Sequence, residues 1–200
     1  AQLAREVADI AHAAGVRRDG RRDRRRAPPR HHDVVLAHQR RALGFRHRGG
    51  GDADHRFAAE HLPGAQPTLI ISPCSSHRLR NWHAAGYAAV ADHAIKQWGM
   101  RVVLCGGPST IEREMADEIK AASAGVLIDL VGKDTLKQLL AMLQRATALL
   151  SPDSGPMHLA GTVGTPVIGL HAATDAERSG PWRDRRWSVN RYAEAAQKFF

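Results

Sequence analysis

Five short apolar runs, separated by stretches with helical periodicity, are the feature that most constrains the fold of this chain. The runs are four or five residues long and lie at 68–72, 101–105, 126–130, 148–151 and 166–170. Continuous apolar runs of this length are typical of strands that are buried on both faces of a sheet. Apolar strands joined by helical crossovers predict an α/β fold with a doubly wound, mostly parallel sheet.

The stretches between the runs predict four helices. The first covers 82–98. The second follows Ser109 and runs to about residue 122, because Ser109 and Glu112 have the spacing of a capping box. A short fourth helix is expected within 152–163. The third helix places four leucines on one face: Leu136, Leu139, Leu140 and Leu143.

Residues 1–66 differ in composition from the rest of the chain. They contain 14 Arg, no Lys and 8 acidic residues, and so carry +6 of the chain's net charge of +9. Apolar periodicity is confined to residues 3–16. Such a segment buries too little apolar surface to offset its loss of conformational entropy. The sequence therefore predicts disorder over 1–66 and a folded domain over 67–200.

Three interpretations of residues 1–66 are open. The segment is a basic arm that neutralises nucleic-acid phosphates, a solvated tail without function, or coding sequence read out of frame. GC-rich codons read in the wrong frame yield Arg, Ala, Gly, Pro and His without Lys. A nucleic-acid-binding arm, in contrast, mixes Lys and aromatic residues with Arg. The composition favours the third interpretation, and no nucleic-acid partner is expected.

Several protein classes are excluded by simple features of the sequence. No run approaches 18 consecutive apolar residues, and the N-terminus lacks the apolar core of a secretory signal. Cys74 and Cys105 are too few for a disulfide-stapled fold or a four-cysteine zinc site. The 12 His residues show no zinc-binding spacing, so neither a metal nor another cofactor is expected. Reducing cytosol is the expected compartment.

The loop at 151–158 is the densest candidate site, because ligands of doubly wound sheets bind beyond the carboxyl ends of the strands. Gly155 permits close backbone approach, and Pro156 suits the first helical position. The free N–H groups of the turn that follows would form an anion site. Asp153 could accept hydrogen bonds from sugar hydroxyls. The alternative is that Asp153 or Ser154 only caps the helix.

Three other loops carry candidate binding residues. Ser75, Ser76 and Arg80 follow the first strand and could hold a diphosphate, and the alternative is a solvated surface loop. Glu112 could bind ribose hydroxyls, with the capping box as its alternative role. Lys133, beside Gly132, is similarly ambiguous.

Taken in order, these loops resemble one family. S-P-D-S-G-P-M-H-L-A-G-T-V-G-T-P-V-I-G-L (151–170) is similar to the signature of bacterial ADP-heptose:lipopolysaccharide heptosyltransferases, glycosyltransferase family nine. The resemblance extends over about residues 68–190 and not before. Four further segments resemble family motifs in the same order: 72–82, 104–112, 131–139 and 171–182.

The resemblance implies a Rossmann-like domain, the C-terminal half of a two-domain GT-B fold, truncated at its C-terminus. In that family this half binds the ADP-sugar donor. The other half binds the acceptor and carries the proposed catalytic Asp, so that the catalytic base is not expected in this chain. The intact enzyme would transfer heptose from ADP-heptose to the lipopolysaccharide inner core, and this chain alone is predicted to be inactive.

The resemblance also implies roles for individual residues. Ser75, Ser76 and Arg80 would contact the diphosphate, with Arg80 in place of the family's usual Lys. Glu112 would bind the ribose, and Lys133 would lie near the adenine. Asp153 would hold heptose hydroxyls. The remaining binding residues would be Ser154, Gly155, Pro156, Met157 and His158.

The resemblance implies a cytoplasmic location, with peripheral contact at the inner membrane where the lipopolysaccharide acceptor is met. Two readings from other classes are kept beside it. One is a catalytically inactive nucleotide-binding remnant, and the other is a nucleic-acid-binding protein that acts through residues 1–66. Salt dependence separates them, because binding by a basic arm weakens steeply with salt.

Overall fold

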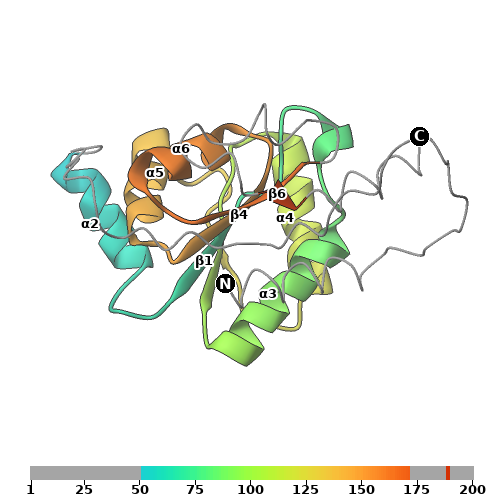
Figure 1. Ribbon diagram of the computed structural model, residues 1–200, viewed down its shortest axis with the longest axis horizontal. Helices are drawn as coiled ribbons and strands as arrows, with labels where there is room; N and C mark the ends of the chain where they lie inside the picture. Colours follow the sequence, from blue (N-terminus) through green and yellow to red (C-terminus); the bar gives the residue numbers. More distant parts are fainter. Residues whose placement is uncertain (1–50, 172–187, 190–200) are drawn as a thin grey trace, which may run out of the picture.

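The computed structural model describes residues 51–171 and 188–189 of the chain, and these form a layered α/β unit (Figure 1). The strands are β1 (Thr68–Ile71), β2 (Arg101–Leu104), β3 (Ile128–Asp129), β4 (Ala148–Pro152), β5 (Val167–Leu170) and β6 (Ser188–Val189). The helices are α2 (Asp52–His61), the 3-10 turn η1 (Arg78–Arg80), α3 (Ala84–Trp98), α4 (Thr110–Ala122), α5 (Leu136–Arg145) and α6 (Gly155–Val163).

The six strands form one parallel sheet with the order β3-β2-β1-β4-β5-β6. This arrangement confirms the doubly wound fold that the five apolar runs predicted. The sixth strand was not predicted, because its two residues are too few to give a pattern. β3 is shorter than predicted, and Val126, expected at its start, is 89% exposed.

Helices cover both faces of the sheet, as Figure 1 shows. Leu69 and Ile71 of β1 pack on the side of α3 and α4, and Ile70 between them packs on the side of α2, α5 and α6. Because alternate side chains meet a hydrophobic layer on either face, the whole strand is buried and three consecutive residues are apolar. This is the physical reason that the strands were visible as continuous apolar runs.

The helix ends differ in detail from the prediction. α3 begins at Ala84, because Trp82 is buried with its ring 5.3 Å from that of Tyr87, and His83 caps the helix through Nδ1. Ser109 caps α4, as predicted. Thr135 and Gln138 form a reciprocal capping box at α5. This box was not predicted, although the three-residue spacing of Thr135 and Gln138 is visible in the sequence.

Two parts of the sequence-based description of the helices are wrong. Leu136 does not share the buried face of α5, since it lies in the first turn, beyond the sheet, and is 67% exposed. Pro156 occupies the second rather than the first position of α6, because the helix already begins at Gly155.

Helix α2 lies within the segment that was predicted to be disordered, so the prediction is wrong for the part of that segment the structure describes. Ala58 and Leu62 are buried in the core beside α5, and Phe57 packs at its border. Arg145 of α5 donates from Nη2 to the carbonyl oxygen of Leu62 at 3.2 Å. These few apolar residues suffice because α5 supplies the opposing surface. The average composition of residues 1–66 concealed them, and residues 1–50 lie outside the described residues.

Candidate functional site

The strand order creates one point where neighbouring strands lead into helices on opposite faces of the sheet. β1 and β4 are adjacent. β1 leads to α3, which packs on one face, whereas β4 leads to α6, which packs on the other. In open α/β sheets, ligands bind at such a point, beyond the carboxyl ends of the strands. Most of the predicted binding residues lie on these two loops, at 72–82 and 153–158.

Hydrogen bonds from α3 and within the loop itself fix the conformation of the loop after β1. Tyr87 of α3 donates from its hydroxyl to the carbonyl of Pro73 at 3.0 Å, and Asn81 Oδ1 accepts from the N–H of Ser75 at 2.7 Å. Ser75 Oγ donates to the carbonyl of His77 at 2.9 Å. The donors of Ser75 are therefore used inside the loop in this structure. Ser76 is exposed and Arg80, at the end of η1, is half-buried.

The loop after β4 brings Asp153 and His158 together. The side chain of Asp153 is 13% exposed, and its Oδ1 lies 3.6 Å from Nε2 of His158, which stands one turn into α6. A protonated His158 pairs with this carboxylate. Asp153 precedes the N-cap residue Ser154 and so lies in the loop rather than in the helix.

Ser154 occupies the N-cap position of α6 without capping it through its side chain. Its Oγ lies 2.9 Å from Oγ of Ser151 instead. The alternative that Ser154 is only a side-chain cap is therefore not what the structure has. A Cβ built on Gly155 would meet nothing within 4 Å, so the space in front of this turn is open to a ligand.

The side chain of Met157 is fully buried, and its sulfur lies 3.1 Å from the Cβ position of Gly169 in β5. His171, also fully buried, approaches the same position at 3.1 Å through Nε2. Gly169 thus makes room for both side chains at the carboxyl end of β5. The Met157 thioether packs α6 onto the sheet, and only the main chain of Met157 is near the loop.

Glu112 lies over the turn that follows β2. Its Oε1 accepts from the N–H of Gly107 at 2.9 Å, and its Oε2 accepts from the hydroxyl of Ser109 at 2.8 Å. A Cβ on Gly107 would lie 2.9 Å from Oε2, so a larger residue there would require the end of the Glu112 side chain to shift. The predicted capping box is therefore half formed. Ser109 caps the helix, but the Glu112 carboxylate reaches two residues further back than the box requires.

The loop after β3 is bonded to the same turn. Gly132 donates from its N–H to the carbonyl of Gly106 at 2.8 Å and has a left-handed φ of 74°. Lys133 is exposed and donates from Nζ to the carbonyl of Asp129 at 2.9 Å. Glu112 and Lys133 thus lie at the ends of β2 and β3, and the other predicted residues lie at β1 and β4.

Asp134 was not among the predicted site residues, although it directly follows Gly132 and Lys133. Burial, and to a smaller extent the negative charge of Glu112, raise the pKa of its carboxyl group to about 6. The pKa of the Cys74 thiol, at the end of β1, is raised to about 12 by burial and by the charge of Glu112. The Glu112 carboxylate therefore acts on groups at the ends of both neighbouring strands. An acidic residue after a predicted strand and a Gly-Lys pair was the signal available in the sequence.

The described residues, 51–171 and 188–189, contain neither a cluster of metal ligands nor a membrane-spanning helix. Within these ranges, no three His, Cys, Asp or Glu side chains are grouped closely enough to hold a metal ion. None of the helices there has the length and apolar character needed to cross a bilayer. Cys74 and Cys105 are both buried, free thiols.

Comparison with known proteins shows which family this chain is similar to. Residues 40–199 match the family described as glycosyltransferase family 9 (heptosyltransferase). The match begins well before Thr68, where the resemblance in the sequence analysis began, and so includes α2. The lipopolysaccharide core heptosyltransferase OpsX of Haemophilus influenzae is 40% identical over 147 residues, or 74% of this chain and 42% of that protein.

Further relatives extend the same picture. Lipopolysaccharide heptosyltransferase 3 of Escherichia coli is 32% identical over 128 residues, or 64% of this chain and 37% of that protein. A glycosyl transferase family 9 crystal structure from Veillonella parvula has a TM-score of 0.60 at 25% identity, over 68% of this chain and 39% of that chain. ADP-heptose LPS heptosyltransferase II of E. coli, at 23% identity and a TM-score of 0.53, shares the fold over 60% of this chain and 37% of its own. The chain spans about two fifths of the length of the relatives it matches.

Proposed function

This chain belongs to glycosyltransferase family 9, the heptosyltransferases, and we propose that its parallel sheet is the part of such an enzyme that binds the nucleotide-sugar donor. The observation that carries the proposal is the divergence of the β1 and β4 loops at the switch point of the sheet. Arg80, at the end of η1, stands on one of these loops, and Asp153 stands on the other.

The β1 loop and the start of α6 suit a diphosphate. Arg80 brings a guanidinium, which forms two parallel hydrogen bonds with phosphate oxygens. Ser76 adds an exposed hydroxyl, and the open space before Gly155 allows the main chain of α6 to approach an anion. Pro156 supports that first turn, and Ser75 orients the loop rather than the ligand.

The two ends of the donor extend from this diphosphate in opposite directions along the sheet edge. Asp153, held by His158, accepts hydrogen bonds from hydroxyls of the sugar. Glu112 accepts from the ribose, and Lys133 lies near the base. The proposed donor is ADP-heptose, and the proposed acceptor is the inner core of lipopolysaccharide, presented at the cytoplasmic face of the inner membrane.

In the proposed transfer, an acceptor hydroxyl oxygen bonds to the anomeric carbon of heptose while the bond from that carbon to the diphosphate breaks. The hydroxyl proton passes to a general base, and ADP leaves with the negative charge. Arg80 and the N–H groups at the start of α6 stabilise that charge. The general base is proposed to lie outside the described residues, because the carboxylates Asp153 and Glu112 are assigned to the donor.

The test of the donor site is the binding of ADP and AMP to the 200-residue chain by calorimetry. Arg80→Ala is expected to weaken ADP binding by about 10- to 100-fold, the value of a charge-assisted hydrogen bond. AMP binding is expected to change by less than about threefold, because the outer phosphate is absent from AMP.

Arg78→Ala is the matched control, since Arg78 stands in the same turn and is exposed. It removes the same charge and should alter the affinity for both nucleotides only slightly. Equal losses for ADP and AMP in Arg80→Ala would remove Arg80 from the diphosphate site. A wild-type chain that is folded and binds neither nucleotide would refute the donor-binding function.

A further inference from the structure

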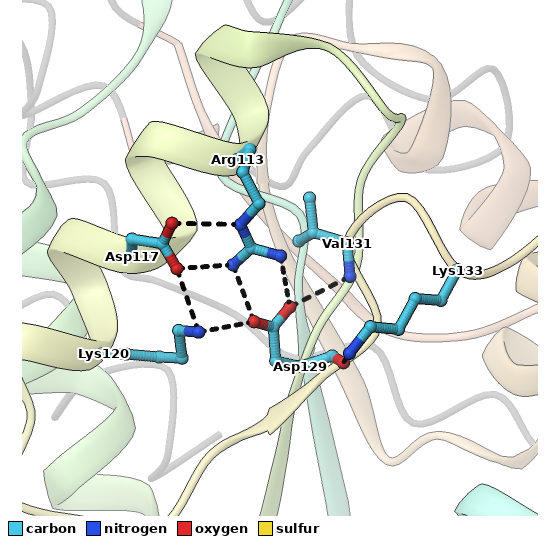
Figure 2. A network of polar contacts seen from close by, with 6 residues as sticks. All are labelled: Arg113, Asp117, Lys120, Asp129, Val131 and Lys133. Carbon is cyan, nitrogen blue, oxygen red and sulfur yellow. Dashed lines mark hydrogen bonds and ion pairs between the residues drawn. The ribbon is translucent and has the colours of Figure 1, made fainter.

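Asp129, the last residue of β3, collects more polar contacts than its position at the edge of the sheet requires (Figure 2). Arg113 of α4 donates to it with both terminal nitrogens, from Nη1 to Oδ1 at 3.1 Å and from Nη2 to Oδ2 at 2.6 Å. Lys120 donates from Nζ to Oδ2 at 2.7 Å. The Asp129 side chain is only 14% exposed, so these are well-shielded, charge-assisted bonds.

The same residue shapes the chain that follows it. Oδ1 of Asp129 accepts from the N–H of Val131 at 3.2 Å, and the Asp129 carbonyl accepts from Nζ of Lys133 at 2.9 Å. Figure 2 shows both contacts converging on Asp129 from the β3–α5 loop. The carboxylate therefore holds the main chain two residues ahead, immediately before the left-handed Gly132.

That loop is in turn packed on the turn after β2. Gly132 bonds to the carbonyl of Gly106, and a Cβ on Gly132 would lie 3.3 Å from Cα of Pro108. The β2 turn is held by Glu112. Glu112 and Arg113 are consecutive residues of α4, so one helical turn holds two adjacent loops, the first through Gly107 and the second through Asp129.

The ionised state of Asp129 favours these contacts between α4 and the β3–α5 loop. Burial alone would raise the pKa of Asp129, but the hydrogen bonds from Arg113 and Lys120 outweigh it and hold the pKa well below its usual range. Asp129 is thus ionised across the whole physiological pH range. Asp117, which also bonds to Arg113 and Lys120, belongs to α4 itself and contacts neither loop in the network.

We infer that Asp129 is a positioning residue, which with Arg113 holds residues 131–134 against the β2 turn and thereby sets the affinity for the nucleoside part of the ligand. The inference rests on the proposed function for the ligand itself. Neighbouring strands lie about 4.8 Å apart, so the loop of β3 lies roughly 10 Å from that of β1. A nucleoside extending from a diphosphate at the β1 loop covers such a span, and the diphosphate itself does not reach the β3 loop.

The test compares Asp129→Asn with Asp117→Asn in the 200-residue chain. Asp129→Asn keeps the size of the side chain but removes the charge and one of the acceptors for Arg113. It is expected to weaken ADP binding about tenfold and to leave inorganic pyrophosphate binding within about twofold of wild type. Amide hydrogen exchange at Val131 and Gly132, measured without ligand, is expected to quicken by about the same factor. Asp117→Asn should change none of these quantities.

Each outcome decides the inference. Unchanged exchange at Gly132 in Asp129→Asn overturns it, and so do equal losses of ADP and pyrophosphate binding, because these indicate a general structural effect. If wild type binds no ADP, the proposed donor site fails, and the ligand-free exchange still decides whether Asp129 holds the loop. If Asp129→Asn does not fold, Arg113→Lys serves instead. It keeps a cation but loses the second hydrogen bond, and it should weaken ADP binding by about threefold with pyrophosphate unaffected.

Discussion

At the scale of single residues, Gly86 shows how one missing methyl group decides the packing at the start of α3. A Cβ at this position would lie 2.4 to 2.6 Å from three atoms of the Trp82 indole ring. Trp82 is 2% exposed and also packs edge-on against Tyr87, so the ring has little room to move. Tyr87 in turn holds the carbonyl of Pro73 in the β1 loop. A change at Gly86 therefore reaches the proposed diphosphate site through two aromatic rings.

Gly86→Ala is expected to destabilise the chain even though Ala favours a helix by about 1 kcal/mol. Overpacking costs about 1–3 kcal/mol, so the net loss should be up to about 2 kcal/mol in the free energy of unfolding by urea. Gly155→Ala is the comparison, since a Cβ there meets nothing within 4 Å. It should change stability by less than about 0.5 kcal/mol. A Gly86→Ala variant as stable as wild type would show that the Trp82 ring yields easily.

Asp134 provides a pH-dependent test at a single carboxyl group. Its pKa is raised to about 6 in the folded chain, first by burial and then by Glu112, from the 3.8 of an ordinary Asp. The folded state therefore binds more protons than the unfolded state between these values, so stability falls as pH rises through about 6.

Asp134→Asn is expected to increase the free energy of unfolding by about 1 kcal/mol at pH 7.5, a value reduced for partial solvent exposure, and hardly at all at pH 4. Unfolding curves at the two pH values measure the difference. Asp117→Asn is the control, because hydrogen bonds from Lys120 and Arg113 lower the pKa of Asp117, and its loss should bring no gain at neutral pH. Equal effects of Asp134→Asn at both pH values would contradict the assignment.

At the scale of secondary-structure elements, α2 and α5 illustrate how an element gains stability from its partner. α2 is short and mostly polar, and its buried residues are few. α5 carries a strongly apolar face of Leu139, Met142 and Leu143 toward the same layer. The bond from Arg145 to Leu62 fixes the end of α2 against α5. Neither helix has enough apolar surface to be stable alone, so they are expected to unfold together.

Leu62→Ala is expected to lower the free energy of unfolding by about 2–4 kcal/mol, because Leu62 is 2% exposed and its truncation leaves a cavity. Leu136→Ala removes the same atoms from a side chain that is 67% exposed, and it should cost less than about 0.5 kcal/mol. Thermal or urea unfolding distinguishes the two. If Leu62→Ala is as harmless as Leu136→Ala, α2 is not part of the cooperative unit.

At the scale of the whole molecule, the strand order β3-β2-β1-β4-β5-β6 gathers loops from four strands at one edge of the sheet. The switch point between β1 and β4 lies near the middle of that edge. The proposed diphosphate therefore lies centrally, with the nucleoside toward β2 and β3 and the sugar at Asp153. The arrangement accommodates one elongated ligand, and the described residues place no further loop against its sugar end.

The chain is accordingly expected to bind ADP-heptose without turning it over. A positioned general base contributes about 10² to 10⁴ in rate, and holding the acceptor in place contributes still more. The measurement is ADP release by the purified chain in the presence of heptose-deficient lipopolysaccharide. A reaction without acceptor gives the background. Steady release above that background, abolished by Asp153→Ala, would mean that this chain carries the complete catalytic machinery.

The sequence by itself determined the positions of β1 to β5, the sharp turn after β2 and the presence of α3 to α6. Strands such as β1 are apolar at consecutive positions, from Leu69 to Ile71, because both faces of the sheet are covered. The Ser109 cap depends only on residues three positions apart. The segments that carry Ser75, Glu112, Lys133 and Asp153 were also predictable from the sequence, because each of them follows a strand.

The tertiary structure decided which of these local features act together. Leu62 meets Arg145 across 83 residues, and Asp129 meets Arg113 on a different element. Neither contact follows from local spacing. The raised pKa of Asp134 likewise depends on burial and on Glu112, which lies in the first turn of α4. Local patterns report interactions within about one helical turn or along one strand, whereas burial and electrostatic environment arise only when distant segments are packed together.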